Sequence, residues 1–415
     1  MKLDEIRAAE AKLLLATYDR HPVLFVGGQG VYIIDERGDR YLDLLSGIGV
    51  NALGYNHPAI VETIARQSRA LIHTSNLYYH AGQAALAQRL TARTGLDRAF
   101  FANSGTEAWE AALKLARAYS TLRRSEGAKI GTQFLALEQS FHGRTFGSMA
   151  TTYKAKYRDP FAPVMPGVQF VRFNDVEDLR AKFSNEVCAI LVEAVQGEGG
   201  VRPISQEFID ETRALTKSTG SLLIVDEIQA GMGRTGKWCA YQHYGIHPDI
   251  TTLAKPLGGG LPIGAVLCTE EVARAMHAGM HGTTFGGGLL TTTVGAAVID
   301  AMEKEGLLKR AAEVGGYFQE KLRGLAKKHS AIVDVRGIGL MIGVEIDSPD
   351  LAKTLVTEMR KRKILINCTS GNVLRFLPPL ILERAHVDAA ITALDDIFTQ
   401  HAATPSAQAK GEQHG

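Results

Sequence analysis

Short apolar runs alternate with amphipathic segments through the middle of this 415-residue chain. Most of the runs are apolar throughout, and they occupy residues 99–101, 134–137, 168–171, 189–192 and 222–225. Continuous runs of this length are typical of strands buried on both faces of a sheet. Amphipathic segments at 107–119 and 206–218 lie between some of them. This alternation predicts βαβ units and an α/β fold with a mainly parallel central sheet flanked by helices.

Two later apolar runs, 250–253 and 263–267, follow each other closely, which favours one antiparallel strand in the same sheet. The pattern changes at both ends of the chain. Residues 4–19 predict an amphipathic helix, and runs at 31–35 and 41–44 flank a glycine-containing turn typical of a β-hairpin. Helices are predicted at 59–70, 83–94, 307–328, 349–362 and 387–400, with strands at 332–336 and 340–346, near Leu365 and around Arg375.

These changes predict the domain organisation. We predict an N-terminal arm over residues 1–20 and a large α/β domain over 59–303 that carries the ligand site. A smaller α+β domain is built from both chain ends, residues 21–58 and 304–402. The tail, residues 403–415, is rich in Ala, Gln and Gly, and we expect it to be disordered.

Composition and charge narrow the class of protein. A hydrophobic content of 45% with 22% charged residues is typical of a soluble globular protein. The net charge of +2 gives no electrostatic reason to expect nucleic acid or an anionic membrane as a partner. The chain lacks a signal-peptide pattern at its start and any run near the roughly 18 apolar residues of a spanning helix. Its four cysteines form no CxxC pair, so we expect a cytoplasmic setting and no metal site.

Polar residues follow each predicted strand where it ends, and ligands bind at the carboxyl ends of strands in parallel α/β sheets. The run at 99–101 is followed by NSGTEA at 103–108, which opens a helix. Ser104 and Glu107 have the spacing of a capping box. The backbone N–H groups of the same turn also form an anion site. From this motif alone, the two interpretations are equally favoured.

Three further strand ends carry candidate chemistry. SFHGRT at 140–145 brings Phe141, which can stack on a flat ring, close to Arg144, which can clamp a carboxylate; a packed Phe beside a surface Arg is the simpler interpretation. EAVQGEGG at 193–200 fits a polar pocket wall or an ordinary loop. Asp226 ends a buried run, so its carboxylate needs a partner, which is a cationic heterocycle, a helix N-terminus or Arg234.

Lys255 lies at the start of a glycine-rich loop, TLAKPLGGGLP at 252–262. A solvated side chain is the ordinary interpretation of a lysine, whereas a desolvated lysine is an amine nucleophile. HGTTFGGG at 281–288 offers hydroxyls and N–H groups for a second phosphate contact, or is a plain flexible loop. Together the motifs supply an anion cradle, an aromatic face, a carboxylate and a lysine, which are the requirements of pyridoxal phosphate.

The motifs at 103–108, 140–145, 226–236 and 252–262 jointly resemble the class III (ornithine-type) aminotransferases of pyridoxal phosphate fold type I, over about residues 20–400. The resemblance implies that Lys255 is the Schiff-base lysine and that Asp226 pairs with the pyridine nitrogen. It implies the remaining cofactor contacts as well: Gly105 and Thr106 at the phosphate, Phe141 and Ile228 on the two ring faces, and Gln229 near the 3-hydroxyl.

The same resemblance implies substrate contacts and a shared site. Arg144 is similar to the clamp for the substrate α-carboxylate, and Thr283 to a further substrate contact. Glu198 and Arg375 correspond to a pair that lets one pocket take two substrates. Thr284 corresponds to a threonine that binds the phosphate of the neighbouring subunit, so the resemblance implies a homodimer with a shared active site.

Two departures and three local similarities bear on the substrate. The family commonly has GGNP where this chain has GGGL at 286–289, and ornithine aminotransferases carry a tyrosine where Ile48 aligns. An acylated amine would not need that tyrosine. The stretches 50–54, 73–78 and 240–245 are most similar to members that act on N-acetylornithine.

We therefore expect an aminotransferase that moves the δ-amino group of N-acetylornithine to 2-oxoglutarate, giving N-acetylglutamate semialdehyde and glutamate, as in arginine biosynthesis. The alternatives within the class are enzymes for 4-aminobutyrate, ornithine, succinylornithine, acetyllysine or carrier-linked aminoadipate semialdehyde. Outside the class, the alternatives are a pyridoxal phosphate mutase or decarboxylase and a catalytically inactive ligand-binding relative.

Overall fold

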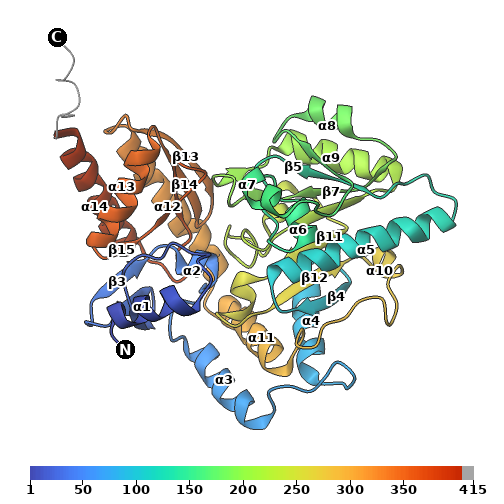
Figure 1. Cartoon of the computed structure of the whole chain (residues 1–415), viewed down its shortest axis with the longest axis horizontal. Helices are drawn as coiled ribbons and strands as arrows, with labels where there is room; N and C mark the ends of the chain where they lie inside the picture. The colour runs from blue at the N-terminus through green and yellow to red at the C-terminus, as the bar shows by residue number, and fades with distance from the viewer. Residues whose placement is uncertain (404–415) are drawn as a thin grey trace.

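A computed structural model describes residues 1–403 of the chain (Figure 1). Its largest element is a seven-stranded sheet in the order β4-β12-β11-β10-β7-β5-β6. The strands of this sheet are β4 (Arg98–Ala102), β5 (Gln133–Leu137), β6 (Val168–Val171), β7 (Val187–Val192), β10 (Leu222–Asp226), β11 (Ile250–Leu253) and β12 (Gly264–Cys268). Of the predicted tail, only Ala403 lies within the described residues.

The sheet is mainly parallel, as the apolar runs predict. β5, β6, β7, β10 and β11 pair in parallel, whereas β12 is antiparallel to both of its neighbours, β4 and β11. The single antiparallel strand is the second of the two closely spaced runs, so that expectation is confirmed. All six residues of β7 are buried, which explains why its sequence is apolar throughout.

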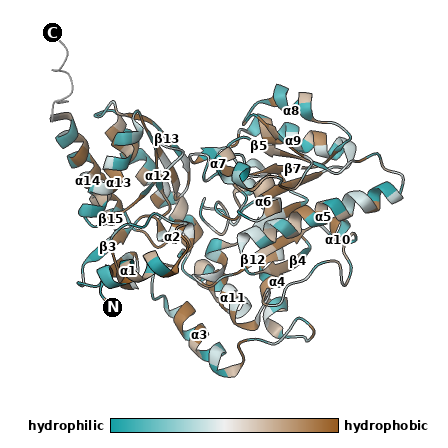
Figure 2. Ribbon diagram, viewed as in Figure 1, coloured by the Kyte–Doolittle hydropathy of each residue, from teal (hydrophilic) through white to brown (hydrophobic). Residues whose placement is uncertain are grey.

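Helices cover both faces of this sheet, so alternate residues of one strand meet different helices. Leu222 and Ile224 of β10 share a core cluster with Trp109 of α5 (Gly105–Ser125). Leu223 and Val225 pack instead into the cluster that contains Phe208 of α9 (Gln206–Thr219). Figure 2 shows the central strands as hydrophobic ribbon between these helices. The fold class is therefore the predicted one.

Two small sheets involve the chain ends. β1 (Phe25–Gln29), β2 (Tyr32–Asp35), β3 (Arg40–Asp43) and β15 (Ile364–Leu365) form one sheet, in which β3 pairs in parallel with β15. The second contains β13 (Ile332–Ile338), β14 (Met341–Ile346), β16 (Asn367–Thr369) and β17 (Val373–Phe376). The β3–β15 pairing supports the prediction that both chain ends contribute to one small domain, although the domain boundaries stay a prediction.

The remaining elements connect these sheets. The longer helices are α3 (Pro58–Ala70), α4 (Ala81–Thr94), α11 (Leu289–Lys304), α12 (Leu307–Ala326), α13 (Pro349–Lys361) and α14 (Arg384–Ala403). The short elements are α2 (Ser46–Gly49), α6 (Phe146–Ala150), α7 (Ala155–Arg158), α8 (Val176–Lys182), α10 (Glu270–Ala273), β8 (Val195–Gln196) and β9 (Arg202–Pro203), with 3-10 turns at Asp159–Phe161, Ala240–Tyr244 and Lys255–Gly258.

Several short elements were not predicted, and three of the longer differences have a physical reason. The predicted helix over 4–19 is α1 (Leu3–Leu13) and stops early, and none of its residues is buried. α11 was not predicted, because its threonine-rich first turn has low helix propensity. β1 was not predicted either, because glycines interrupt its pattern. Gly28 is required there, since a Cβ atom would lie 2.6 Å from Cγ of Tyr55.

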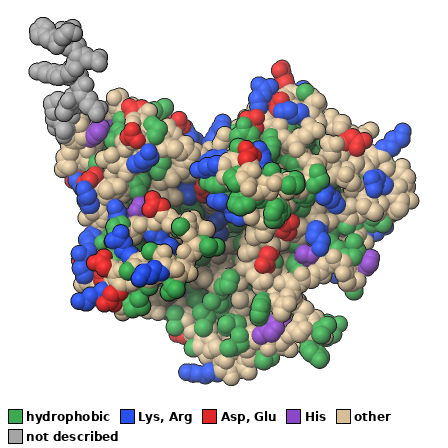
Figure 3. All heavy atoms as spheres, viewed as in Figure 1, with side chains coloured by type: hydrophobic (Ala, Val, Ile, Leu, Met, Phe, Trp, Pro, Cys, Tyr) green, Lys and Arg blue, Asp and Glu red, His purple; other side chains and the backbone are tan. Residues whose placement is uncertain are grey.

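A hollow separates the part of the molecule built from the chain ends from the part that contains the large sheet (Figure 3). Basic side chains gather beside this hollow over α7, which carries Lys156 and Arg158. Across residues 1–403, every helix is too short or too polar to cross a membrane.

Candidate active site

A cavity of about 510 Å³ lies at the carboxyl ends of the central strands. Nine of the predicted site residues line it: Gly105, Thr106, Phe141, Arg144, Glu198, Asp226, Ile228, Gln229 and Lys255. They come from the segments that follow β4, β5, β7, β10 and β11, which end at the same edge of the sheet. Arg375 contacts two of these lining residues, whereas Thr283 and Thr284 are outside the lining.

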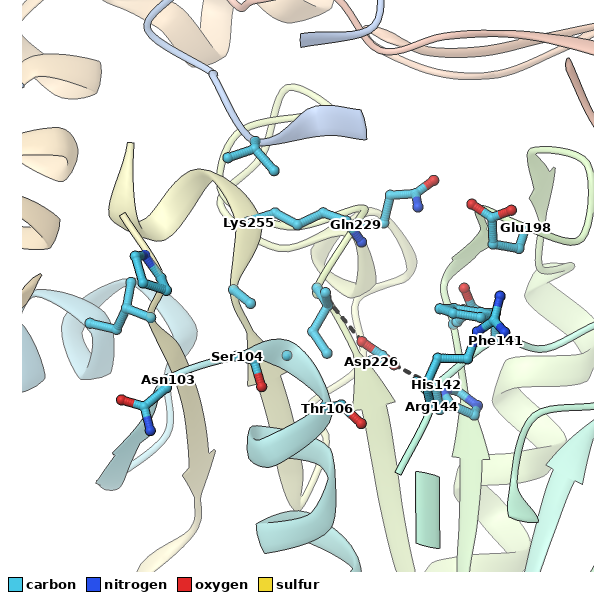
Figure 4. A pocket seen from close by; sticks show the side chains of 18 of the residues that line it. Asn103, Ser104, Thr106, Phe141, His142, Arg144, Glu198, Asp226, Gln229 and Lys255 are labelled. Carbon is cyan, nitrogen blue, oxygen red and sulfur yellow. Dashed lines mark hydrogen bonds and ion pairs between the residues drawn. The ribbon is translucent and has the colours of Figure 1, made fainter. Parts of the chain in front are cut away.

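Lys255 begins the turn that follows β11, and its backbone φ is +44°. Its side chain extends into the cavity beside Gln229, with Asp226 below it (Figure 4). Burial lowers the pKa of the Lys255 ammonium, while the carboxylates of Asp226 and Glu198 oppose that shift. A lysine with a lowered pKa has a larger fraction of neutral amine, which is the form that acts as a nucleophile or base.

Asp226 is buried at the floor of the cavity and is held by three hydrogen bonds. Its Oδ1 accepts from the Ile228 backbone N–H at 3.0 Å and from Thr252 Oγ1 at 3.2 Å. Its Oδ2 lies 2.7 Å from Nδ1 of His142, which donates to the carboxylate. Arg234 is not its partner, because that guanidinium donates to the carbonyls of Pro378 and Leu340.

His142 is a functional side chain that the sequence interpretation missed. Its ring stacks on Trp109 of α5, with the centroids 4.0 Å apart and the planes 8° apart. Its Nε2 is buried without a hydrogen-bond partner among the described residues. A signal was present, since a buried aspartate requires a donor and SFHGRT supplies a histidine at a neighbouring strand end.

Phe141 and Ile228 are apolar residues of the cavity lining. The Phe141 backbone N–H donates to Oε2 of Glu193 at 3.2 Å, and Oε1 of Glu193 accepts from the Gly197 N–H at 3.2 Å. Burial raises the pKa of Glu193 to about 8, and the nearby Asp226 charge adds to the shift. Ile228 packs so closely on the first turn of α5 that a Cβ atom on Gly105 would lie 2.9 Å from Cδ1 of Ile228.

The N-terminus of α5 faces the cavity and has the character of an anion site. Ser104 caps this 21-residue helix by accepting from the Glu107 N–H at 3.2 Å. The predicted capping box is only half formed, because the Glu107 carboxylate accepts from the Asn103 N–H at 2.6 Å instead of reaching back to Ser104. The helix dipole and free N–H groups favour a phosphate at this end.

Arg144 is exposed beside the cavity and has no carboxylate partner among the described residues. Its guanidinium lies over the Tyr157 ring at 3.8 Å and near the Phe141 ring at 5.6 Å from the centroid. Stacking orients the planar guanidinium while leaving its donors available for a ligand carboxylate. Tyr157 was not identified from the sequence.

Arg375 is buried and forms an ion pair with Glu198. It also donates to Gln229 Oε1 at 3.2 Å and to Asn367 Oδ1 at 3.2 Å. Burial opposes ionisation of Glu198, but the charge and hydrogen bond of Arg375 outweigh it and lower the pKa of the carboxyl group. One charged pair therefore closes the cavity opposite Lys255.

Thr283 and Thr284 belong to a loop on the other side of α5. Thr283 Oγ1 accepts from Nδ2 of Asn103 at 3.2 Å and from the Gly286 N–H at 3.2 Å. Thr284 is exposed. Neither hydroxyl reaches the cavity of its own chain.

Comparisons with known proteins agree with this geometry. The family described as "Aminotransferase class-III" matches residues 15–398. The acetylornithine aminotransferase of Methanocaldococcus jannaschii is 48% identical over 394 residues, which cover 94% of this chain and 97% of that protein. The chain belongs to the class III aminotransferase family.

Two solved structures are similar over nearly the whole chain. The ornithine aminotransferase of Toxoplasma gondii, with pyridoxal phosphate at its active site, superposes with a TM-score of 0.91 at 31% identity, covering 96% of this chain and 94% of that one. The acetylornithine aminotransferase of Elizabethkingia anophelis gives 0.85 at 30% identity, covering 96% and 100%. The fold is therefore that of the fold type I aminotransferases.

The cavity fits the cofactor of this class, which is pyridoxal phosphate. Asp226 offers a carboxylate for a ring nitrogen, Phe141 and Ile228 offer two apolar faces, and the α5 N-terminus offers donors for a phosphate. The missing side chain at Gly105 keeps the path to that helix end open. The chain is a pyridoxal-phosphate-dependent transaminase.

Proposed function

We propose that this chain transfers the δ-amino group of N-acetylornithine to 2-oxoglutarate. The observation that carries the proposal is a cavity lined by Lys255, by Arg144, which has no carboxylate partner among the described residues, and by Glu198, which is paired with Arg375. The acetylornithine aminotransferases that share 48% and 30% identity with this chain support the donor. The products are N-acetylglutamate semialdehyde and glutamate, which is the chemistry of arginine biosynthesis.

The chain's own residues account for the proton and charge steps. Pyridoxal phosphate, when bound, supplies an aldehyde that takes up an amino group and a cationic ring that withdraws electrons. Lys255 would hold the cofactor carbonyl carbon until the donor's amino group displaces it, and its released amine would then move the proton between the substrate carbon and that carbon. Asp226, held in place by its three donors, would stabilise the positive charge on the ring nitrogen.

Two arginines explain how one cavity could take two substrates. Arg144 would bind the α-carboxylate of N-acetylornithine and later one carboxylate of 2-oxoglutarate. Arg375 is neutralised by Glu198 while the donor is bound, which leaves no uncompensated charge against an acyl group. It becomes available to the second carboxylate of 2-oxoglutarate when Glu198 moves.

The acylated donor is favoured over free ornithine by Ile48. This residue has a backbone φ of +64° in α2, two residues before Val50, which lines the cavity. An isoleucine cannot hydrogen-bond a free amino group, and an amide does not require such a partner. A 4-aminobutyrate enzyme remains the second candidate, because Arg144 could equally bind its single carboxylate.

We infer a cytoplasmic homodimer with a shared active site. Thr284 is exposed and outside the cavity of its own chain, which supports its contribution to a neighbouring one. Phe285 is exposed in the same loop, and Leu77 and Tyr79 are exposed in the segment that contacts this loop through Asn76. All four cysteines are free thiols, which supports the cytoplasmic setting.

The test is a half-reaction followed by absorbance of the bound cofactor. Without any 2-oxo acid, N-acetylornithine should convert the cofactor to its amine form with one equivalent of semialdehyde, and 2-oxoglutarate should restore it. Ornithine and 4-aminobutyrate should react at least about 10-fold more slowly. The Lys255→Ala variant should lose at least about 10³-fold in rate.

Conversion by 4-aminobutyrate but not by N-acetylornithine would contradict the substrate. Sustained turnover without a 2-oxo acid would instead identify a mutase or decarboxylase. A wild-type protein with no cofactor absorbance would contradict the whole assignment.

A further inference from the structure

Glu198 lies in the wall between two cavities. It lines the active-site cavity and also a second cavity of about 470 Å³, and it is the residue common to both linings among those described. The second cavity lies between α7 and the turn that follows β16, and its lining includes Lys154, Lys156 and Lys353. Glu198 therefore separates the active-site cavity from a cavity lined by lysine side chains.

The proposed function requires Glu198 to leave Arg375, because the second carboxylate of 2-oxoglutarate needs that guanidinium. Among the described residues, the other donor to the Glu198 carboxylate is the Thr369 hydroxyl at 3.4 Å. A carboxylate that left Arg375 would therefore be a buried charge without a cationic partner, which is unfavourable. The main chain of Glu198 stays in place, since its carbonyl accepts from Lys154 at 2.9 Å, Thr369 at 3.1 Å and Ser370 at 2.8 Å. Only the side chain has to rotate.

Three cations lie close enough to lower the pKa of Glu198: Arg375, Lys255 and Lys154. Arg375 is the partner that the carboxylate leaves, and Lys255 has to move the proton between substrate and cofactor in this half-reaction, so it cannot stay paired with Glu198. Lys154 remains. Its Nζ contacts only neutral oxygens, the Glu198 carbonyl and Ser370 Oγ at 3.5 Å, so among the described residues it has no carboxylate partner.

We propose that Lys154 is the second partner of Glu198, and that the Glu198 carboxylate swings from Arg375 to the Lys154 ammonium when a dicarboxylate 2-oxo acid binds. This inference rests on the proposed function, because it concerns the half-reaction that uses 2-oxoglutarate. Lys154 is a positioning residue in this scheme: it keeps the displaced carboxylate paired and so lets one cavity accept both substrates. An ammonium group has three donors, and two of those of Lys154 are in use, so one remains for the carboxylate.

The kinetic test compares two acceptors with the amine form of the holoenzyme. In Lys154→Met, kcat/KM for 2-oxoglutarate should fall about 10- to 100-fold, mainly through KM, because Arg375 is harder to free. For N-acetylglutamate semialdehyde, whose reacting carbon lies as far from its α-carboxylate as in the donor and which therefore needs only Arg144, kcat/KM should change less than about threefold. Lys154→Arg should recover part of the 2-oxoglutarate activity.

Lys156→Met is the matched control. It removes the same charge from the same cavity, but the Lys156 side chain is exposed and lies over the Tyr157 ring at 5.0 Å. It should leave the ratio between the two acceptors unchanged. Equal losses for both acceptors in Lys154→Met would indicate a merely structural role and overturn the proposal, as would an equal ratio change in Lys156→Met.

A crystal structure of the holoenzyme with glutarate, a dicarboxylate that cannot react, gives a second measurement independent of activity. A Glu198 carboxylate within about 3 Å of Lys154 Nζ is the expected result. A Glu198 that stays on Arg375, or turns to solvent, would refute the switch. The amine form of the cofactor can also be prepared with glutamate, so the test of the switch does not depend on N-acetylornithine being the donor. Failure of the donor assignment is therefore distinguishable from failure of the switch.

Discussion

At the scale of single residues, the hydrogen bond from His142 holds the carboxylate of Asp226 in place. A buried carboxylate is stable only with donors, and the shortest contact of Asp226 is the 2.7 Å bond to Nδ1 of His142. The Trp109 ring fixes the plane of the imidazole from one side. His142 thus holds Asp226 in place at the wall of the cavity, which it also lines.

This arrangement predicts the effect of His142→Phe, which preserves the ring stacking and removes the donor. Cofactor affinity should fall about 10- to 100-fold, since a hydrogen bond to a charged group is worth about 1.5–3 kcal/mol. A titration of the apoprotein with pyridoxal phosphate, followed by absorbance, measures it. His142→Asn, which keeps a donor, should lose less; equal losses in both variants would contradict the orienting role.

At the scale of elements, the same helix cap serves both stability and the ligand site. Ser104 caps α5 and Ser205 caps α9, and both hydroxyls accept from the N3 backbone N–H at 3.2 Å. Only α5 directs its N-terminus into the cavity. The two serine caps have the same geometry, but only the cap of α5 lies at the ligand site, so the Ser205 cap serves as a control for the Ser104 cap.

Ser104→Ala and Ser205→Ala should each lower the free energy of unfolding by about 1 kcal/mol, because each leaves a helix N–H without its acceptor. Only Ser104→Ala should also weaken pyridoxal phosphate binding, since the frayed turn carries the phosphate donors. Denaturant unfolding and a cofactor titration measure the two effects. Weakened binding in Ser205→Ala would mean that helix stability alone, rather than the α5 terminus, controls affinity.

Periodicity predicted most elements to within a few residues, because burial on both faces leaves a direct trace in the strands. The failures have physical reasons. α11 contains Thr291, Thr292 and Gly295, which disfavour helices, yet it is held between α3 and α4 and next to the Lys255 turn. A Cβ atom at Gly295 would lie only 3.1 Å from the Leu257 carbonyl oxygen, so close packing favours the glycine there against local propensity.

On the scale of the whole molecule, the stability of the fold depends on buried carboxyl groups. Glu227 is fully buried and accepts from the Ala240 N–H at 2.8 Å and the Tyr241 N–H at 2.9 Å. Burial raises its pKa to about 8, against about 4.3 in an unfolded chain. The folded state thus binds this proton more tightly than the unfolded state does.

The contribution of Glu227 is therefore complete below about pH 4 and is lost as the pH rises through about 8. The wild type should lose stability relative to Glu227→Gln across this window, by at most about 1.4 kcal/mol per pH unit. Denaturant unfolding at several pH values measures the difference. The pKa of Glu193 is also raised, but this residue is present in both the wild type and Glu227→Gln and cancels in the difference. Equal pH dependence of the unfolding free energy in the two proteins would mean that Glu227 does not titrate in this range.

The proposed dimer makes a separate prediction about Thr284. Thr284→Ala should lower cofactor affinity about 10-fold, although the hydroxyl is outside the cavity of its own chain. Light scattering should show a dimer for both proteins. Thr121→Ala, which removes an exposed hydroxyl on α5, is the control. An unchanged affinity in Thr284→Ala would contradict a shared site.

The sequence by itself determined the sheet, the strand ends and the candidates that follow them, including Lys255, Asp226 and Phe141. Apolar runs and the residues after them are local properties, and parallel strands collect their carboxyl ends at one edge. Only the tertiary structure decided the partners. His142 and Asp226 are 84 residues apart in the chain, and Glu198 and Arg375 are 177 apart. Which donor meets which carboxylate depends on packing between distant segments, and no local pattern encodes it.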